Sequence, residues 1–229
     1  MNGVDLLVFD CDGVLVDSEA LVMEVEAAML TDAGFPLTTD EIADEFIGLS
    51  YSTMMRELGA RHGRPVPDAL SQRVQQAALD RFPDHLRSVP GMAELLAGSD
   101  RPRCVASSSN VDRIELSLRV TGLADRFDPG SIFSAQMVAR GKPAPDLFLL
   151  AATTLGVAPS RCLVIEDSTA GVTAAGAAGM AVVGLVAGGH ARPHLGARLR
   201  QAGASRVFER VDQLADFLDG QPAGEPQPG

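Results

Sequence analysis

The sequence predicts an α/β fold in which a doubly wound parallel sheet carries an inserted all-helical domain. Short runs that are continuously apolar recur along the chain, as in parallel strands that are buried on both faces. From residue 91 onward these runs alternate with helical patterns, which is typical of βαβ units. The stretch from about 18 to 89 contains no convincing strand and has helical patterns instead.

Six apolar runs have the composition of buried strands. The first stands before the helical stretch and the other five follow it, so the helical stretch interrupts the α/β domain directly after its first strand. In chain order the runs are LLVF (6–9), CVA (104–106), SIF (131–133), CLVIE (162–166), AVVGLV (181–186) and RVF (206–208).

Three helices can be placed in the helical stretch from the spacing of their apolar residues. The first is expected to stop at Gly34, Ser52 is expected to cap the second, and Pro67 is expected to open the third. Their apolar faces are Leu21, Val22, Val25, Ala28 and Met29 in the first, Met54, Met55 and Leu58 in the second, and Leu70, Val74, Ala77 and Ala78 in the third.

These patterns predict two domains and a tail. The α/β core is expected to comprise residues 1–17 and 90–218, with the helical domain at 18–89 joined to it near Asp17 and Pro90. The last residues, 219–229, have the Pro, Gly and Gln composition of a disordered end.

Composition excludes several classes of protein. The chain has 229 residues, of which 46% are hydrophobic, and this is ample for a packed core. Its formal net charge of −11 argues against a nucleic-acid partner. No run approaches the roughly 20 apolar residues of a membrane-spanning helix, and the N-terminus lacks a basic leader. We therefore expect a cytoplasmic protein with no membrane partner.

Cys11, Cys104 and Cys162 are widely spaced, and each lies inside an apolar run. An odd number with neither disulfide-framework nor zinc spacing indicates buried thiols in a reducing compartment.

The first predicted strand ends in the sequence FDCDG. Asp10 and Asp12 project to the same side of an extended chain, and ligands of an open parallel sheet bind where the strands end. Two adjacent carboxylates repel each other unless a proton or a cation lies between them, and Mg²⁺ favours such oxygen ligands. An acidic loop with no function explains this motif equally well when it is taken alone.

Three later segments also fall where predicted strands end. A phosphate cradle and plain helix capping are both consistent with Ser107, Ser108, Ser109 and Asn110 before a helix. A loop stiffened by two prolines holds Lys142, which is either a positioned charge for phosphate or a surface lysine.

The third segment contains Glu166 and Asp167, which complete an oxygen-rich metal site or else form an acidic pair favoured by the dipole of the following helix. Four segments of this kind fall at strand ends, in an order consistent with one doubly wound sheet. This agreement favours one metal site that handles phosphate over four unrelated segments without a function.

Together, these motifs closely resemble the haloacid dehalogenase (HAD) superfamily of phosphohydrolases, which have a Rossmann-like core. The helical insertion resembles the cap of the branch that contains β-phosphoglucomutase, phosphoglycolate phosphatase and 6-phosphogluconate phosphatase-type proteins. The resemblance rests on DCDGVLVDSE (10–19), VASSSN (105–110), GKPAPD (141–146) and VIEDSTAGVTAAGAAGM (164–180).

The resemblance implies roles for individual residues. Asp10 would attack phosphorus to form an aspartyl-phosphate, and Asp12 would protonate the leaving alcohol and then activate water. Ser107 and Lys142 would hold the transferring phosphoryl group. Mg²⁺ would be bound by Asp10, the backbone carbonyl of Asp12 and Asp167, with Glu166 in or next to that shell.

Departures from the motifs of the superfamily narrow the range of activities that we expect. Dehalogenases of the superfamily lack the aspartate at position 12, so we do not expect dehalogenation. Val22 and Tyr51 stand where the mutase branch has a histidine and an arginine, which favours a phosphatase over a phosphomutase.

The substrate-facing residues of the helical domain are harder to place. Together with Ser108 and Asn110 of the core, Glu19 and Tyr51 are candidates for substrate binding. Arg56 either clamps an acidic group of the substrate or is a solvated surface residue. The further candidates are Gly48, Ser50 and Ser52. His190 and His194 resemble metal ligands but have no acidic or cysteine partner nearby in the sequence, and we do not assign them a metal.

We therefore expect a magnesium-dependent phosphatase acting on a small phosphorylated metabolite, in the class of sugar or sugar-acid phosphates, as a monomer or weak homodimer. The alternatives are a β-phosphoglucomutase-like phosphomutase and a non-catalytic regulatory protein that binds a phosphometabolite.

Overall fold

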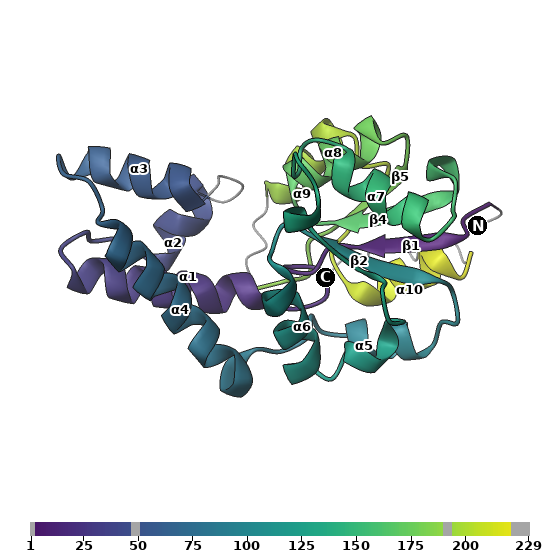
Figure 1. Cartoon of the computed structure of the whole chain (residues 1–229), viewed down its shortest axis with the longest axis horizontal. Helices are drawn as coiled ribbons and strands as arrows, with labels where there is room; N and C mark the ends of the chain where they lie inside the picture. Colours follow the sequence, from purple (N-terminus) through teal and green to yellow (C-terminus); the bar gives the residue numbers. More distant parts are fainter. Residues whose placement is uncertain (1–2, 47–50, 190–193, 221–229) are drawn as a thin grey trace, which may run out of the picture. The chain divides into compact units, whose positions relative to one another are not determined.

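The computed structural model describes residues 3–46, 51–189 and 194–220 (Figure 1). The chain divides into two compact units, of which one comprises Met1–Asp17 with Arg87–Gly229 and the other Ser18–Leu86. The boundary on the C-terminal side thus lies between Leu86 and Arg87, a few residues before the position expected from the sequence. Within the described residues, no helix is long and apolar enough to cross a membrane.

The larger unit is built on a six-stranded sheet in the order β3-β2-β1-β4-β5-β6, in which every neighbouring pair is parallel. This confirms the predicted fold class. Val8 at the centre of β1 lies in register with Cys104 on β2 and Val164 on β4. The strands are β1 (Leu6–Phe9), β2 (Arg103–Ser107), β3 (Ile132–Ser134), β4 (Cys162–Glu166), β5 (Ala181–Leu185) and β6 (Val207–Phe208).

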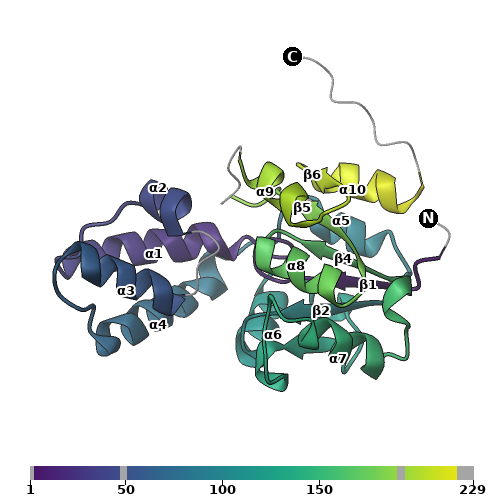
Figure 2. The same ribbon diagram turned by 90° about the horizontal axis from the view of Figure 1, so that it is seen from above.

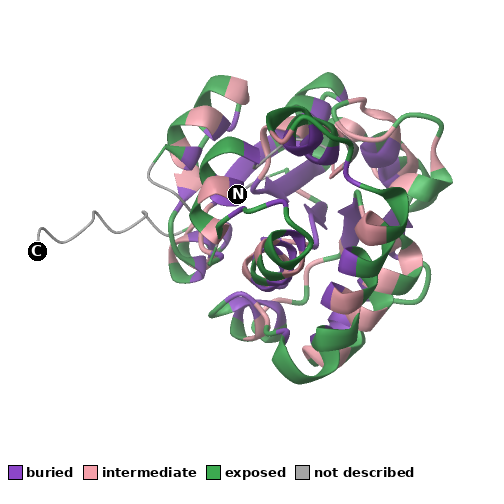
Figure 3. Ribbon diagram, turned by 90° about the vertical axis from the view of Figure 1, so that its left-hand side faces the viewer, coloured by how far each residue is buried: buried purple, intermediate pink, exposed green. Residues whose placement is uncertain are grey.

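Helices cover both faces of the sheet, with α7, α8 and α9 on one face and α5, α6 and α10 on the other (Figures 1 and 2). The central strands are buried on both faces, as their continuously apolar sequences predicted, while exposed positions gather on the outer faces of the helices (Figure 3). The helices are α5 (Met92–Ala97), α6 (Val111–Val120), α7 (Asp146–Thr154), α8 (Thr169–Ala177), α9 (Leu195–Ala202) and α10 (Val211–Leu218).

The strand order places a topological switch point at β1. The chain runs from β1 to β2 and β3 on one side and then returns to β4 on the other side of β1. Because all strands are parallel, the carboxyl ends of β1, β2 and β4 lie side by side at one edge of the sheet.

The smaller unit is a helical bundle with its own apolar core, in which α1 packs against α4. Phe35, Leu58 and Val74 are among its fully buried side chains. Its elements are α1 (Ser18–Asp32), α2 (Thr39–Glu41), a short π-helix (Ile42–Phe46), α3 (Tyr51–Arg61) and α4 (Asp68–His85).

Two expectations for this helical unit were wrong in detail. Ala28 is exposed, and α1 instead buries Met23 and Leu30, because this helix is apolar on so many sides that spacing alone does not select the packed face. The helix α3 begins at Tyr51, so Ser52 lies inside its first turn and not at the position before it. In contrast, Gly34 follows α1 in a left-handed conformation, as a helix stop requires.

Candidate active site

The candidate active site lies in the larger unit, at the carboxyl ends of β1, β2 and β4. Asp10 follows the last residue of β1, and its backbone amide donates to the carbonyl of Ile165 on β4 at 3.0 Å. Gly13 then turns the chain with φ of +79°, a conformation that favours glycine. The amide of Gly13 donates to the Val16 carbonyl at 2.8 Å, which closes a tight loop that fixes Asp10 and Asp12 at the sheet edge.

Lys142 joins two of the predicted site residues. Its ammonium Nζ lies 2.6 Å from Asp10 Oδ1 and 2.5 Å from Glu166 Oε1, and its side chain is only 3% exposed. Burial alone would lower the pKa of Lys142, but the two carboxylates more than reverse this and raise it above the ordinary value. Lys142 is therefore a fixed cation inside the site and not a surface lysine.

Asp10 is itself buried among charges. Burial raises the pKa of Asp10 well above its usual range, the Lys142 ammonium opposes this, and the Glu166 and Asp167 carboxylates reinforce it. One ammonium faces three carboxylates, so the cluster has an excess of negative charge that a further cation would neutralise.

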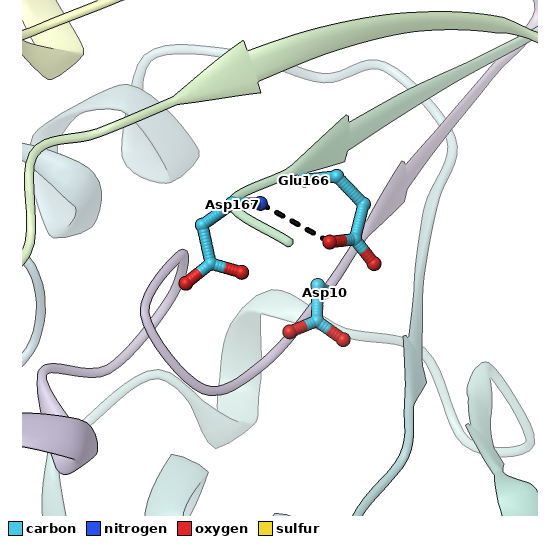
Figure 4. Close-up of side chains that lie close together, drawn as sticks. All are labelled: Asp10, Glu166 and Asp167. Atoms are coloured by element: carbon cyan, nitrogen blue, oxygen red, sulfur yellow. Dashed lines mark hydrogen bonds between the residues drawn. The ribbon is translucent and has the colours of Figure 1, made fainter. Parts of the chain in front are cut away.

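The excess charge is concentrated in a small space. Asp10, Glu166 and Asp167 each offer a carboxylate oxygen, and these oxygens all lie within 4.8 Å of one another (Figure 4). Among the described residues, 3–46, 51–189 and 194–220, these three carboxylates are the one group of ligand-type side chains that lie close enough together to hold a metal ion. An all-oxygen donor set of this kind fits a hard cation such as Mg²⁺.

Glu166 is held by the protein on both of its oxygens. Its Oε1 contacts Lys142. Its Oε2 accepts from the amides of Asp167 and Ser168 at 3.1 and 3.0 Å and from the Ser168 hydroxyl at 2.9 Å. Figure 4 shows the hydrogen bond from the Asp167 amide. The carboxylate fills the space where a side chain at Gly171 would lie, since a Cβ there would meet Oε1 at 1.8 Å. Glu166 thus holds Lys142 in place beside Asp10.

Asp12 has partners that the sequence did not reveal. Its Oδ2 accepts from the Ser109 hydroxyl at 2.6 Å, and its Oδ1 pairs with Arg113 Nη2 at 2.8 Å. Arg113 is in the first turn of α6, where side chains point back toward the start of the helix. A basic residue three positions after the predicted cap Asn110 was the available signal for Arg113.

The loop after β2 provides the remaining predicted residues. Ser107 is almost fully buried, and its hydroxyl oxygen accepts from the Ser109 amide at 3.1 Å. Asn110 caps α6 by accepting from the Arg113 amide at 2.8 Å, while Ser108 is exposed. The structure therefore brings Asp10, Asp12, Ser107, Lys142, Glu166 and Asp167 to one edge of the sheet.

The predicted residues of the helical domain lie in the smaller unit. Glu19 is in the first turn of α1, and Tyr51 begins α3, with its hydroxyl donating to the Ser71 carbonyl at 3.3 Å. Arg56 is exposed and lines a groove of this unit together with Tyr51. His194, just before α9, is not part of the acidic cluster. Gly48, Ser50, the side chain of Ser52 and His190 lie outside the described residues.

Known proteins combine the same fold with similar sequences. Residues 7–185 match the haloacid dehalogenase-like hydrolase family. The chain is 29% identical over 194 residues to 6-phosphogluconate phosphatase of Escherichia coli, covering 84% of this chain and 87% of that protein. It is 34% identical over 224 residues to a probable pseudouridine-5'-phosphatase of Drosophila melanogaster, covering 92% and 90%.

A solved structure extends this similarity to three dimensions. A HAD family hydrolase from Deinococcus radiodurans, crystallised with bound phosphate and sodium, is 36% identical to this chain with a TM-score of 0.81. The alignment covers 96% of this chain and 97% of that one.

The fold and the site define an α/β protein whose acidic cluster and buried lysine lie at the switch point of a parallel sheet, where such sheets bind their ligands. The chain belongs to the haloacid dehalogenase-like hydrolase family and is an enzyme of that family.

Proposed function

We propose that this protein is a magnesium-dependent phosphatase that hydrolyses a small phosphorylated metabolite through an aspartyl-phosphate on Asp10. The observation that carries the proposal is the position of Asp10, a buried carboxylate held by the Lys142 ammonium next to Glu166 and Asp167. A nucleophile in that place has a neighbouring cation for the substrate phosphate and an acidic cluster for a metal ion.

Each group near Asp10 has a role in the proposed reaction. An oxygen of Asp10 attacks phosphorus, and the bond from phosphorus to the alcohol oxygen breaks. Lys142 and Ser107 orient the phosphoryl group and offset its charge. Asp12 gives a proton to the departing alcohol in the first step and takes one from the attacking water in the second, so the proton balance closes over the cycle.

The proposed metal site consists of Asp10, Asp167 and the backbone carbonyl of Asp12, with Glu166 next to it. When bound, Mg²⁺ would neutralise charge that develops on the phosphoryl oxygens. Asp10, Glu166 and Asp167 fit this ion through their hard oxygen donors and their shared negative charge.

The proposed substrate class is that of sugar or sugar-acid phosphates. It is supported by the 6-phosphogluconate phosphatase and pseudouridine-5'-phosphatase relatives. Ser108 and Asn110 in the larger unit and Glu19 and Tyr51 in the helical unit, which we propose to be a cap domain, are the proposed substrate-recognition residues.

A panel of phosphorylated metabolites with Mg²⁺ tests the function. We expect release of inorganic phosphate by the wild-type protein, loss of release in Asp10→Asn and in excess EDTA, and normal release in Asp125→Asn, whose aspartate is exposed on the same unit. Full activity of Asp10→Asn, or turnover without a divalent metal, would contradict the mechanism. Isomerisation of a sugar phosphate without release would identify a phosphomutase, and phosphate binding without any turnover would identify a regulatory protein.

A further inference from the structure

Two side chains donate hydrogen bonds to the Asp12 carboxylate, one to each of its oxygens. The Ser109 hydroxyl donates to Oδ2 at 2.6 Å, and Arg113 Nη2 donates to Oδ1 at 2.8 Å. All three residues belong to the larger unit, although Asp12 and Arg113 are 101 positions apart in the chain. The Asp12 side chain is 16% exposed and that of Arg113 is 26% exposed, so the pair is shielded but reachable by a small molecule.

Both donors are themselves held in place. The Ser134 hydroxyl, fully buried on β3, donates to the Ser109 carbonyl at 2.7 Å and thereby ties the Ser109 backbone to the sheet. Asn110 caps α6 on the amide of Arg113, which fixes the backbone from which the guanidinium extends. The hydrogen bonds to Asp12 therefore depend on the ends of β2 and β3 and on the start of α6.

This arrangement fixes the orientation of the Asp12 carboxylate. With one donor on each oxygen, the carboxylate cannot rotate without breaking a hydrogen bond. A general base must lie within hydrogen-bond reach of the water that it deprotonates, so a fixed orientation serves the second step, in which a water attacks the aspartyl-phosphate.

We propose that Arg113 and Ser109 are positioning residues that hold Asp12 as the base of the water-activating step. The inference rests on the proposed function, because it assumes an aspartyl-phosphate on Asp10. In that step water oxygen bonds to phosphorus, the bond from phosphorus to the Asp10 oxygen breaks, and the water proton passes to Asp12. Arg113 and Ser109 touch neither the substrate nor the reacting atoms in this scheme, and they act through Asp12.

The two steps can be separated with p-nitrophenyl phosphate. Its leaving group is a weak base, so the first step proceeds without a proton from Asp12, and only the second step depends on the held carboxylate. Rapid-quench measurements of p-nitrophenolate and inorganic phosphate then report the first and the second step separately.

We expect Arg113→Met to slow phosphate release at least about tenfold, within the range that acid–base groups contribute, while the first turnover of p-nitrophenolate stays within about threefold of wild type. A burst of p-nitrophenolate and accumulation of phosphorylated protein should appear. Ser109→Ala should show the same pattern with a smaller factor, and Arg113→Lys should restore part of the rate because it keeps a cation at this place.

Arg119→Met is the matched control, since Arg119 is an exposed arginine on the same helix, and it should behave as wild type. In an Asp12→Asn background, Arg113→Met should have little further effect. Equal slowing of both steps, or no slowing of phosphate release in an Arg113→Met protein with wild-type Tm, would overturn the inference. Failure of the proposed function is distinguishable, because the wild-type protein would then release no phosphate and form no phosphorylated intermediate.

Discussion

Replacing Gly171 with alanine adds one methyl group at the place where the Glu166 carboxylate lies. The new Cβ would be 1.8 Å from Oε1, 1.9 Å from Cδ and 2.4 Å from Oε2 of Glu166, so the carboxylate must move. Moving it breaks the contact with Lys142 and the hydrogen bonds from Asp167 and Ser168. The substitution therefore removes the contacts that hold Glu166 and Lys142 in place, without replacing a proposed catalytic residue.

The expected cost follows from the burial of these groups. The Glu166 and Lys142 side chains are 0% and 3% exposed, and breaking a buried ion pair costs about 3–5 kcal/mol. Alanine in a helix is otherwise favoured over glycine by about 1 kcal/mol, which offsets only part of this cost. We therefore expect a loss of about 2–4 kcal/mol in the free energy of unfolding and a large loss of phosphatase activity.

The same helix provides the control. Gly176 also lies in α8, and a Cβ there would meet nothing within 4 Å. Gly176→Ala should therefore stabilise the protein by about 0.5–1 kcal/mol. Urea unfolding of both variants measures the difference directly.

A double-mutant cycle isolates the cause. In a Glu166→Ala background the clash is absent, so adding Gly171→Ala should cost nothing further. If Gly171→Ala alone is as stable as Gly176→Ala, or if its cost is unchanged in the Glu166→Ala background, the steric reasoning is refuted.

Three other predictions concern the buried groups of the larger unit. Lys142→Met should lower the free energy of unfolding by about 3–5 kcal/mol in urea titrations, because Glu166 loses its buried cation. Mg²⁺ should raise the Tm of the wild-type protein in proportion to the logarithm of its concentration but not that of Asp167→Asn, and an equal rise in both would contradict the metal assignment. Burial raises the pKa of the Cys11 and Cys104 thiols, so their thiolate fraction stays low at pH 7–9. A disulfide reagent should therefore find no reactive thiol among the three cysteines before unfolding, and prompt labelling of the native protein would count against their burial.

The main elements of the fold could be predicted from the sequence because their signals are local. An apolar run such as CLVIE is buried on both faces wherever it sits in a parallel sheet, so its composition alone indicates a central strand. The face that α1 buries could not be predicted in the same way. Glu26 is buried, whereas Ala28 is exposed, because packing against α4 selects among several apolar sides.

The residues at the ends of the strands were also readable from the sequence. Parallel strands bring their carboxyl ends to one edge, so Asp10, Lys142 and Asp167 could be assigned to one site before any distance was known. For Glu166 the sequence left open whether it binds the metal directly or stands next to it. That assignment stays a prediction, and the structure adds what the sequence could not show: the Glu166 carboxylate contacts Lys142, accepts from backbone amides and fills the space at Gly171.

By itself, the sequence determined the fold class, the strands and the residue types at the switch point, since each depends on the order of residues along short segments. Only the tertiary structure decided which charges meet. The pairing of Arg113 with Asp12 depends on the rotation of α6 and on the loop at Gly13, and neither segment specifies it alone. Charge pairing is a property of the assembled sheet edge, where a contact of 2.8 Å joins Asp12 after β1 to Arg113 at the start of α6.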